Sequence, residues 1–184
     1  ARAAQLYCRG CGRPVRRDTP DSIFAQLAVR ALAAGDPRLV IVFPVPIPHN
    51  FSEQEVLTLL EAQGYTRLHA RSGDTLEVVQ DRLRMSSAER VRVIEALEAA
   101  LRVGQGRVAV HALDDSGAPA ATWKFSSDLH CADCDIHYAE PTPSLFSFNS
   151  PIGACETCRG FGRSIGIDYA LVITDPSRSL RDGA

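Results

Sequence analysis

The chain has 184 residues, of which 45% are hydrophobic and 23% are charged, a composition typical of folded globular proteins. Its formal net charge of −2 and its pI near 6.2 argue against nucleic-acid binding through overall positive charge, because phosphate neutralisation requires a clustered cationic face. No apolar run approaches the length of a membrane span, and residues 1–6 lack the apolar segment of a signal peptide. We therefore expect a cytoplasmic protein that does not enter a membrane.

The first 36 residues combine a cysteine-containing turn with a helix. Residues 7–14 are rich in Cys, Gly and Arg, which is typical of a turn. Thr19 supplies an N-cap hydroxyl and Pro20 favours the first helical position, so a helix should begin there and end at Gly35. We expect residues 1–36 to form a zinc-knuckle half-site and a linking helix.

Strand and helix signals alternate in the next part of the chain. The unbroken apolar run at residues 39–43 predicts a central strand, and the proline-rich residues 44–50 predict a loop. Two S-x-x-E capping boxes, Ser52 to Glu55 and Ser86 to Glu89, predict the starts of two helices. Further strands are predicted at residues 65–70, 75–85, 107–113 and 121–125.

The resulting order of elements, β-α-β-β-α-β, predicts a ferredoxin-like sandwich. Right-handed crossovers would place its first and third strands at the centre of the sheet. The predicted fold class is therefore α+β: a ferredoxin-like sandwich domain over residues 37–125 with an attached four-cysteine zinc module over residues 126–184. This fold hosts many functions, so it does not indicate an activity.

All six cysteines fall in three C-x-x-C pairs. In a cytoplasmic chain, where thiols stay reduced, paired spacing of this kind favours zinc over disulfides. Two pairs separated by twenty residues can supply four thiolates to one tetrahedral ion and close a structural site. The sequence thus predicts zinc bound by Cys131, Cys134, Cys155 and Cys158.

The remaining pair, Cys8 and Cys11, is predicted to be half of a second zinc site. A redox pair is the alternative, but Gly12 and the residues after it continue a turn where a thioredoxin-type motif needs a helix. His130 and His137 lie beside the expected four-cysteine site and could replace one of its ligands.

A resemblance to a known family is carried by residues 145–162, which read L-F-S-F-N-S-P-I-G-A-C-E-T-C-R-G-F-G. This stretch closely resembles the zinc module of the UvrA family, the damage-sensing ABC-type ATPases of nucleotide excision repair. Residues 168–184 resemble the segment that follows that module, the start of the family's ATPase signature region, with Thr174 where the family usually has proline. Residues 7–12 and 76–83 resemble segments flanking and inside the insert through which the family binds UvrB.

The resemblance implies a fragment of an SOS-response repair protein that serves as the docking domain for UvrB. It implies that the parent protein binds DNA and forms a homodimer. A phosphate-binding G-x-x-x-x-G-K-[ST] loop is absent from the sequence, so we expect this fragment to be non-catalytic although its parent hydrolyses ATP. Candidate contacts to UvrB are Arg67, Asp81, Arg82 and Arg84.

Two other functions are compatible with the zinc module. The module could contact DNA directly, with Arg159 and Arg163 on phosphates and Phe146 and Phe148 stacking on bases. It could also be a DnaJ-like chaperone module, since residues 155–162 fit its C-x-x-C-x-G-x-G unit. Those modules use several such units, whereas one complete copy stands here.

Overall fold

The computed structural model describes residues 5–163, 166–167, 169–173 and 175–182. It divides into two compact units, Gln5–Ala139 and a unit that contains Glu140–Ala184. The sequence features at Asp168, Thr174 and residues 183–184 lie outside the described residues. Within the described part of the chain, no helix has the length and apolar character needed to cross a membrane.

Two of the main helices begin at the predicted caps. Helix α1 spans Pro20–Ala33, and the Thr19 hydroxyl accepts a hydrogen bond from the Ser22 backbone N–H while the Ser22 hydroxyl accepts one from the Thr19 N–H. Helix α2 spans Glu53–Ala62 behind a reciprocal box of the same kind between Ser52 and Glu55. Each box satisfies backbone donors that the first helical turn leaves free.

The third helix departs from its predicted start. Helix α3 spans Arg90–Val103, and its N-cap residue, Glu89, makes no side-chain cap hydrogen bond. The Ser86 backbone N–H instead donates to Asp36 Oδ1 at 3.2 Å, which ties this segment to the turn after α1. On α3, Val93 is fully buried whereas Val91 is 66% exposed, so Val93 belongs to the face that packs on the core.

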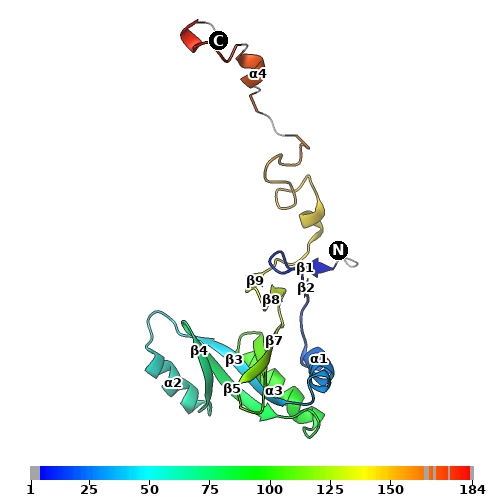
Figure 1. Ribbon diagram of the computed structural model, residues 1–184, viewed down its shortest axis with the longest axis vertical. Helices are drawn as coiled ribbons and strands as arrows, with labels where there is room; N and C mark the ends of the chain where they lie inside the picture. The colour runs from blue at the N-terminus through cyan, green and yellow to red at the C-terminus, as the bar shows by residue number, and fades with distance from the viewer. Residues whose placement is uncertain (1–4, 164–165, 168, 174, 183–184) are drawn as a thin grey trace. The chain divides into compact units, whose positions relative to one another are not determined.

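One five-stranded antiparallel sheet has the order β4-β5-β3-β6-β7. Its strands are β3 (Arg38–Pro46), β4 (Leu68–Ser72), β5 (Thr75–Leu83), β6 (Arg107–Leu113) and β7 (Pro119–Ser126) (Figure 1). β3 continues to Pro46, where a loop was predicted. Because β6 pairs with β3 only as far as Val42, the prolines fall where β3 has one partner strand, a position that tolerates a missing N–H.

The two faces of the sheet differ in what covers them. Leu39, Ile41 and Phe43 of β3 belong to the main core, which also contains the buried side chains of α1, α2 and α3. Side chains alternate along a strand, so Val40 and Val42 point to the other face, where they cluster with residues of β5 and β6. We call this second face the open face; it carries Val40, Val42, Glu77, Val79, Arg82, Ala109, His111 and Thr122.

Two small hairpins complete the first unit. One is formed by β1 (Leu6–Tyr7) and β2 (Pro14–Val15), and the other by β8 (His130–Cys131) and β9 (Ile136–His137). The second unit contains only short helical turns among its described residues: η1 (Pro143–Phe146), α4 (Tyr169–Val172) and η2 (Leu180–Asp182).

Candidate metal centre and interaction surface

The two small hairpins bring four cysteines together. Cys8 and Cys11 lie between β1 and β2; Cys131 ends β8, and Cys134 lies in the turn between β8 and β9. Figure 1 shows the two hairpins. One sulfur from each residue lies within 4.8 Å of the other three. Cys8 and Cys131 are buried, and they pack with Val15 in a small apolar cluster that Leu6, Ile136 and Tyr138 extend.

The spacing of these sulfurs fits a tetrahedral ion. The Cys11 and Cys131 Sγ atoms are 3.7 Å apart. Two thiolates at about 2.3 Å from one zinc ion lie roughly 3.8 Å from each other when the geometry is tetrahedral. Four thiolates without a free position are the donor set of a structural zinc site. The four cysteines can therefore hold a metal ion.

Contacts between distant segments explain why the hairpins meet. The Asp18 backbone N–H, just before α1, donates to the Ser126 carbonyl at the end of β7 at 2.8 Å. This joins the chain entering α1 to the chain leaving the sheet. Arg13 forms an ion pair with Asp133 across the two hairpins, and a Cβ placed on Gly10 would lie only 3.1 Å from Cys134 Sγ. Glycine at position 10 thus permits the close approach of the hairpins.

Two of the four thiols, those of Cys8 and Cys134, have pKa values shifted in opposite directions. The Tyr138 hydroxyl donates to the Cys8 sulfur and, with backbone N–H groups, lowers the pKa of Cys8 to about 6. Sharing a hydrogen bond with the Cys11 sulfur, together with burial, raises the pKa of Cys134 to about 12. At neutral pH, Cys8 is therefore a thiolate while Cys134 keeps its proton. A divalent cation would displace that proton, because metal-bound cysteine is deprotonated.

This grouping differs from the predicted cysteine pairing. Cys131 and Cys134 were expected to share an ion with Cys155 and Cys158, but Cys8 and Cys11 complete their group of four. Cys155 and Cys158 belong to the other compact unit, in a turn where the Arg159 N–H donates to the Cys155 carbonyl at 2.7 Å. The reason is topological: Cys8 and Cys131 are distant in sequence, but the α1 and β7 ends bring them together.

The two histidines near the centre have other partners. His130 Nε2 lies 2.8 Å from Asp135 Oδ1, and His137 Nε2 lies 2.9 Å from an Arg107 guanidinium nitrogen. Neither belongs to the four-sulfur group. Tyr138 is a residue that the sequence reasoning missed. Its hydroxyl also accepts from the Arg9 N–H at 2.8 Å, and nothing in the local sequence pattern marks that role.

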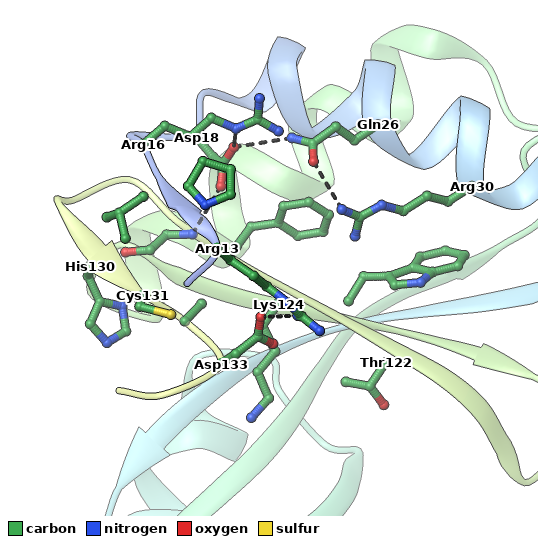
Figure 2. A pocket seen from close by; sticks show the side chains of 16 residues that line it. Arg13, Arg16, Asp18, Gln26, Arg30, Thr122, Lys124, His130, Cys131 and Asp133 are labelled. Carbon is green, nitrogen blue, oxygen red and sulfur yellow. Dashed lines mark hydrogen bonds and ion pairs between the residues drawn. The ribbon is translucent and has the colours of Figure 1, made fainter. Parts of the chain in front are cut away.

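A cavity of about 420 Å³ lies beside the centre, between α1, β7 and the β8–β9 hairpin (Figure 2). Several basic side chains line it, but most have partners. Arg16 forms an ion pair with Asp18, with 3.5 Å between nitrogen and oxygen. The Arg30 guanidinium lies 5.8 Å from the centroid of the Trp123 ring and donates a hydrogen bond of 3.2 Å to Gln26 Oε1. These groups connect the helix, the sheet and the hairpin, and they offer little unpaired positive charge.

The four predicted partner contacts lie in different settings. Arg67 and Arg82 are exposed, and Arg84 donates to the Asp36 carbonyl at 2.8 Å. Asp81 instead binds Arg92 of α3 through both carboxylate oxygens, at 2.9 and 3.0 Å, and so connects the sheet to a helix. Arg38, which sequence reasoning missed, joins Arg82 and Arg84 around a notch of about 280 Å³.

Comparison with known proteins matches these features to one family. A family model described as the UvrA interaction domain matches residues 68–114, which run from β4 through β6. UvrABC system protein A of Mycobacterium bovis is 34% identical over 201 aligned residues, which cover 100% of this chain and 20% of that relative. The proteins of the same name from Xanthomonas campestris and Helicobacter pylori are 34% and 29% identical, each over 100% of this chain and over 20% and 21% of their own lengths.

The chain belongs to the UvrA family. It spans about a fifth of the length of the curated relatives that it matches. The matched interaction domain lies between the two cysteine pairs of the centre, Cys8 and Cys11 before it and Cys131 and Cys134 after it. The four-cysteine group therefore joins the two ends of the segment that contains the UvrA interaction domain.

Proposed function

We propose that this chain is the UvrB-docking part of a UvrA protein of nucleotide excision repair, held at its base by a structural zinc ion. The match to the UvrA interaction domain over β4 to β6 supports docking, and it includes Arg82 and Arg84. We attribute DNA binding, ATP hydrolysis and dimer formation to the remainder of the longer protein. The chain itself acts through binding rather than catalysis.

The observation that carries the docking proposal is the notch formed by Arg38, Arg82 and Arg84 at one end of β3 and β5. Within the described residues, neither Arg38 nor Arg82 forms an ion pair, and both side chains are exposed. Planar guanidinium groups can bind carboxylates through two parallel hydrogen bonds. We therefore propose that acidic side chains of UvrB bind in this notch.

Calorimetry with purified UvrB tests the docking site. The double variant Arg38→Ala, Arg82→Ala should weaken binding at least about 10-fold, and the loss should shrink as salt is raised, because exposed charges are screened. Arg102→Ala is the matched control, since Arg102 is an exposed arginine in the last turn of α3. Equal affinities for the double variant and the control would remove the notch from the interface.

Zinc at the four-cysteine group is the second part of the proposal. It is supported by the sulfur spacing, the four-thiolate donor set and the low pKa of Cys8. Elemental analysis of the purified chain should find zinc that the double variant Cys8→Ser, Cys131→Ser lacks. The control is the double variant Cys155→Ser, Cys158→Ser, because any zinc that it loses is not bound by the four-cysteine group. Full zinc content in the first variant would contradict the proposal.

We further propose that residues 37–125 are the partner-binding domain and form a ferredoxin-like sandwich extended at one edge. The strand order supports this: the first and third strands of the predicted unit, β3 and β5, are neighbours, and the second and fourth, β4 and β6, flank them. β7 and α1 would then be additions that bring the two cysteine hairpins together. Backbone comparison of the isolated domain with other sandwiches of that class would test the assignment.

A further inference from the structure

Three side chains of types that ligate metals meet on the open face, in a group distinct from the four cysteines. His69, Glu77 and His111 come from β4, β5 and β6, and one potential ligand atom from each lies within 4.8 Å of the others. The His111 side chain is buried, and the imidazoles of His69 and His111 stack with their centroids 4.3 Å apart. The group therefore spans β3 and joins the edge strand β4 to β6.

The distances within this group suit a shared ion. His111 Nε2 lies 3.2 Å from Glu77 Oε2. Two ligands bound to one zinc ion at about 2.0 Å lie roughly 3.3 Å apart in a tetrahedral site. On its other side, His111 Nδ1 lies 2.9 Å from Thr122 Oγ1. With an ion bound between His111 and Glu77, the imidazole proton would lie on Nδ1 and be donated to the threonine hydroxyl, so that Nε2 offers its lone pair to the ion, as in metal-binding histidines oriented by an outer hydrogen bond.

The charge states also suit a cation. The hydrogen bond from His111 lowers the pKa of Glu77, so the carboxylate is ionised. Burial and the neighbouring His111 lower the pKa of His69, which keeps that imidazole neutral with a free lone pair. Two imidazoles and one carboxylate form a donor set used by zinc and related divalent transition metals.

A second group, His130, Asp135 and His137, is a weaker candidate. Arg107 lies 3.3 Å from Asp135 and 2.9 Å from His137, so a positive charge already occupies that group. Glu77 lines a solvent-connected cavity of about 310 Å³, which His130 and Asp135 of the second group also line. An ion held by three protein ligands there would keep a coordination position for water or an incoming group.

We propose that His69, Glu77 and His111 bind one divalent transition-metal ion in an exchangeable site, separate from the four-cysteine centre. The ion would cross-link β4, β5 and β6 on the face that the helices leave uncovered. This inference does not depend on UvrB docking or on zinc at the cysteines, because its ligands and its spectroscopic signature are different.

Cobalt titration of the full, untagged chain tests the site. Thiolate-bound Co²⁺ gives intense sulfur-to-metal charge-transfer bands, whereas Co²⁺ held by nitrogen and oxygen gives only weaker visible bands. The wild-type chain should bind an additional equivalent with the second signature. His69→Gln and Glu77→Gln should weaken that equivalent at least about 100-fold, because even loss of an outer hydrogen bond to a ligand costs roughly 10- to 100-fold. Thr122→Val should weaken it about 10-fold.

His49→Gln is the matched control, because His49 is an exposed histidine in the loop after β3. It should bind cobalt as the wild type does. The sulfur charge-transfer bands and far-UV circular dichroism report folding independently, so a misfolded variant is recognised. Absence of the nitrogen and oxygen signature in the wild type, or its persistence in both His69→Gln and Glu77→Gln, would overturn the proposal.

Discussion

The two compact units differ in where their large apolar side chains lie. In the first unit, Ile23, Phe43 and Leu97 are fully buried between the helices and the sheet. In the second, four large apolar side chains are 62–76% exposed: Phe146, Phe148, Ile152 and Phe161. Apolar burial is the main stabilising contribution in folding, so the first unit has the means to fold alone. The second must gain stability from backbone turns, from metal or from other parts of the longer protein.

Glycine contacts show how the second unit keeps its conformation without a core. Gly160 has a positive φ of 90°, and a Cβ at that position would lie 2.2 Å from the Phe148 carbonyl oxygen. A Cβ on Gly153 would lie 2.4 Å from the Ser144 carbonyl oxygen. The chain therefore folds back on itself at points that only glycine can occupy. The following experiments test this contrast between a packed unit and a turn-based one.

Metal removal should produce the largest effect. Structural zinc contributes on the order of 10 kcal/mol to the folding of the segments that it joins. A chelator, or the variant Cys131→Ser, should therefore free the two hairpins and speed tryptic cleavage after Arg9 and Arg16. Cys158→Ser should leave those two sites as protected as in the wild type. Equal cleavage rates with and without chelator would show that the hairpins hold together without metal.

Truncation of a phenylalanine should have opposite consequences in the two units. Phe43→Ala removes a fully buried ring and should lower the free energy of unfolding by about 3–5 kcal/mol. Phe148→Ala removes a ring that is 65% exposed and should change it by no more than about 0.5 kcal/mol. Urea unfolding followed by the fluorescence of Trp123, which packs against the main core, measures both. A comparable loss in the two variants would refute the contrast.

Helix capping offers a smaller comparison within the first unit. Ser52→Ala removes the hydroxyl that accepts from the Glu55 N–H and should lower the free energy of unfolding by about 1 kcal/mol. Ser86→Ala should have a smaller effect, because Ser86 caps no helix and alanine keeps the backbone N–H that donates to Asp36. Thermal unfolding of both variants distinguishes a real cap from a sequence match. A larger loss in Ser86→Ala would reverse this interpretation.

The smallest expected effect is a pH dependence at Asp36. Hydrogen bonds from Ser86 lower the pKa of Asp36 in the folded state. The unfolded chain then binds this proton more readily, so the stabilisation is complete above an unfolded pKa of about 3.9 and is lost as pH falls through the folded value. Asp36→Asn keeps a residue suited to the positive φ of 54° and should be less stable than wild type at neutral pH. Urea titrations should show the difference in free energy of unfolding between Asp36→Asn and wild type narrowing below about pH 4. If the Asp36 carboxylate does not stabilise the fold, this difference should not change with pH.

Local sequence patterns predicted the elements well where the interactions are local. The Thr19 and Ser52 caps and the apolar run at residues 39–43 depend on neighbouring residues, and each corresponds to an observed element. The Ser86 box failed because a tertiary partner, Asp36, competes for the Ser86 N–H. Local spacing does not reveal such partners.

The cysteine grouping illustrates the same limit at longer range. Spacing marked each pair as a candidate ligand pair, and it favoured partners that are near in sequence. The observed partners depend on the hydrogen bond between Asp18 and Ser126, which the fold creates at the junction of α1 and β7. The group of His69, Glu77 and His111 was not predicted for a similar reason: its members come from three different strands, which only the fold brings together.

The separation of 120 residues between Cys11 and Cys131 has a consequence for the denatured chain. A metal ion bound by both hairpins would act as a cross-link that closes a very long loop. The conformational entropy removed from an unfolded chain grows with the length of the loop that is closed. Such an ion would favour refolding of the whole intervening domain, even though it contacts none of the side chains in that domain's core.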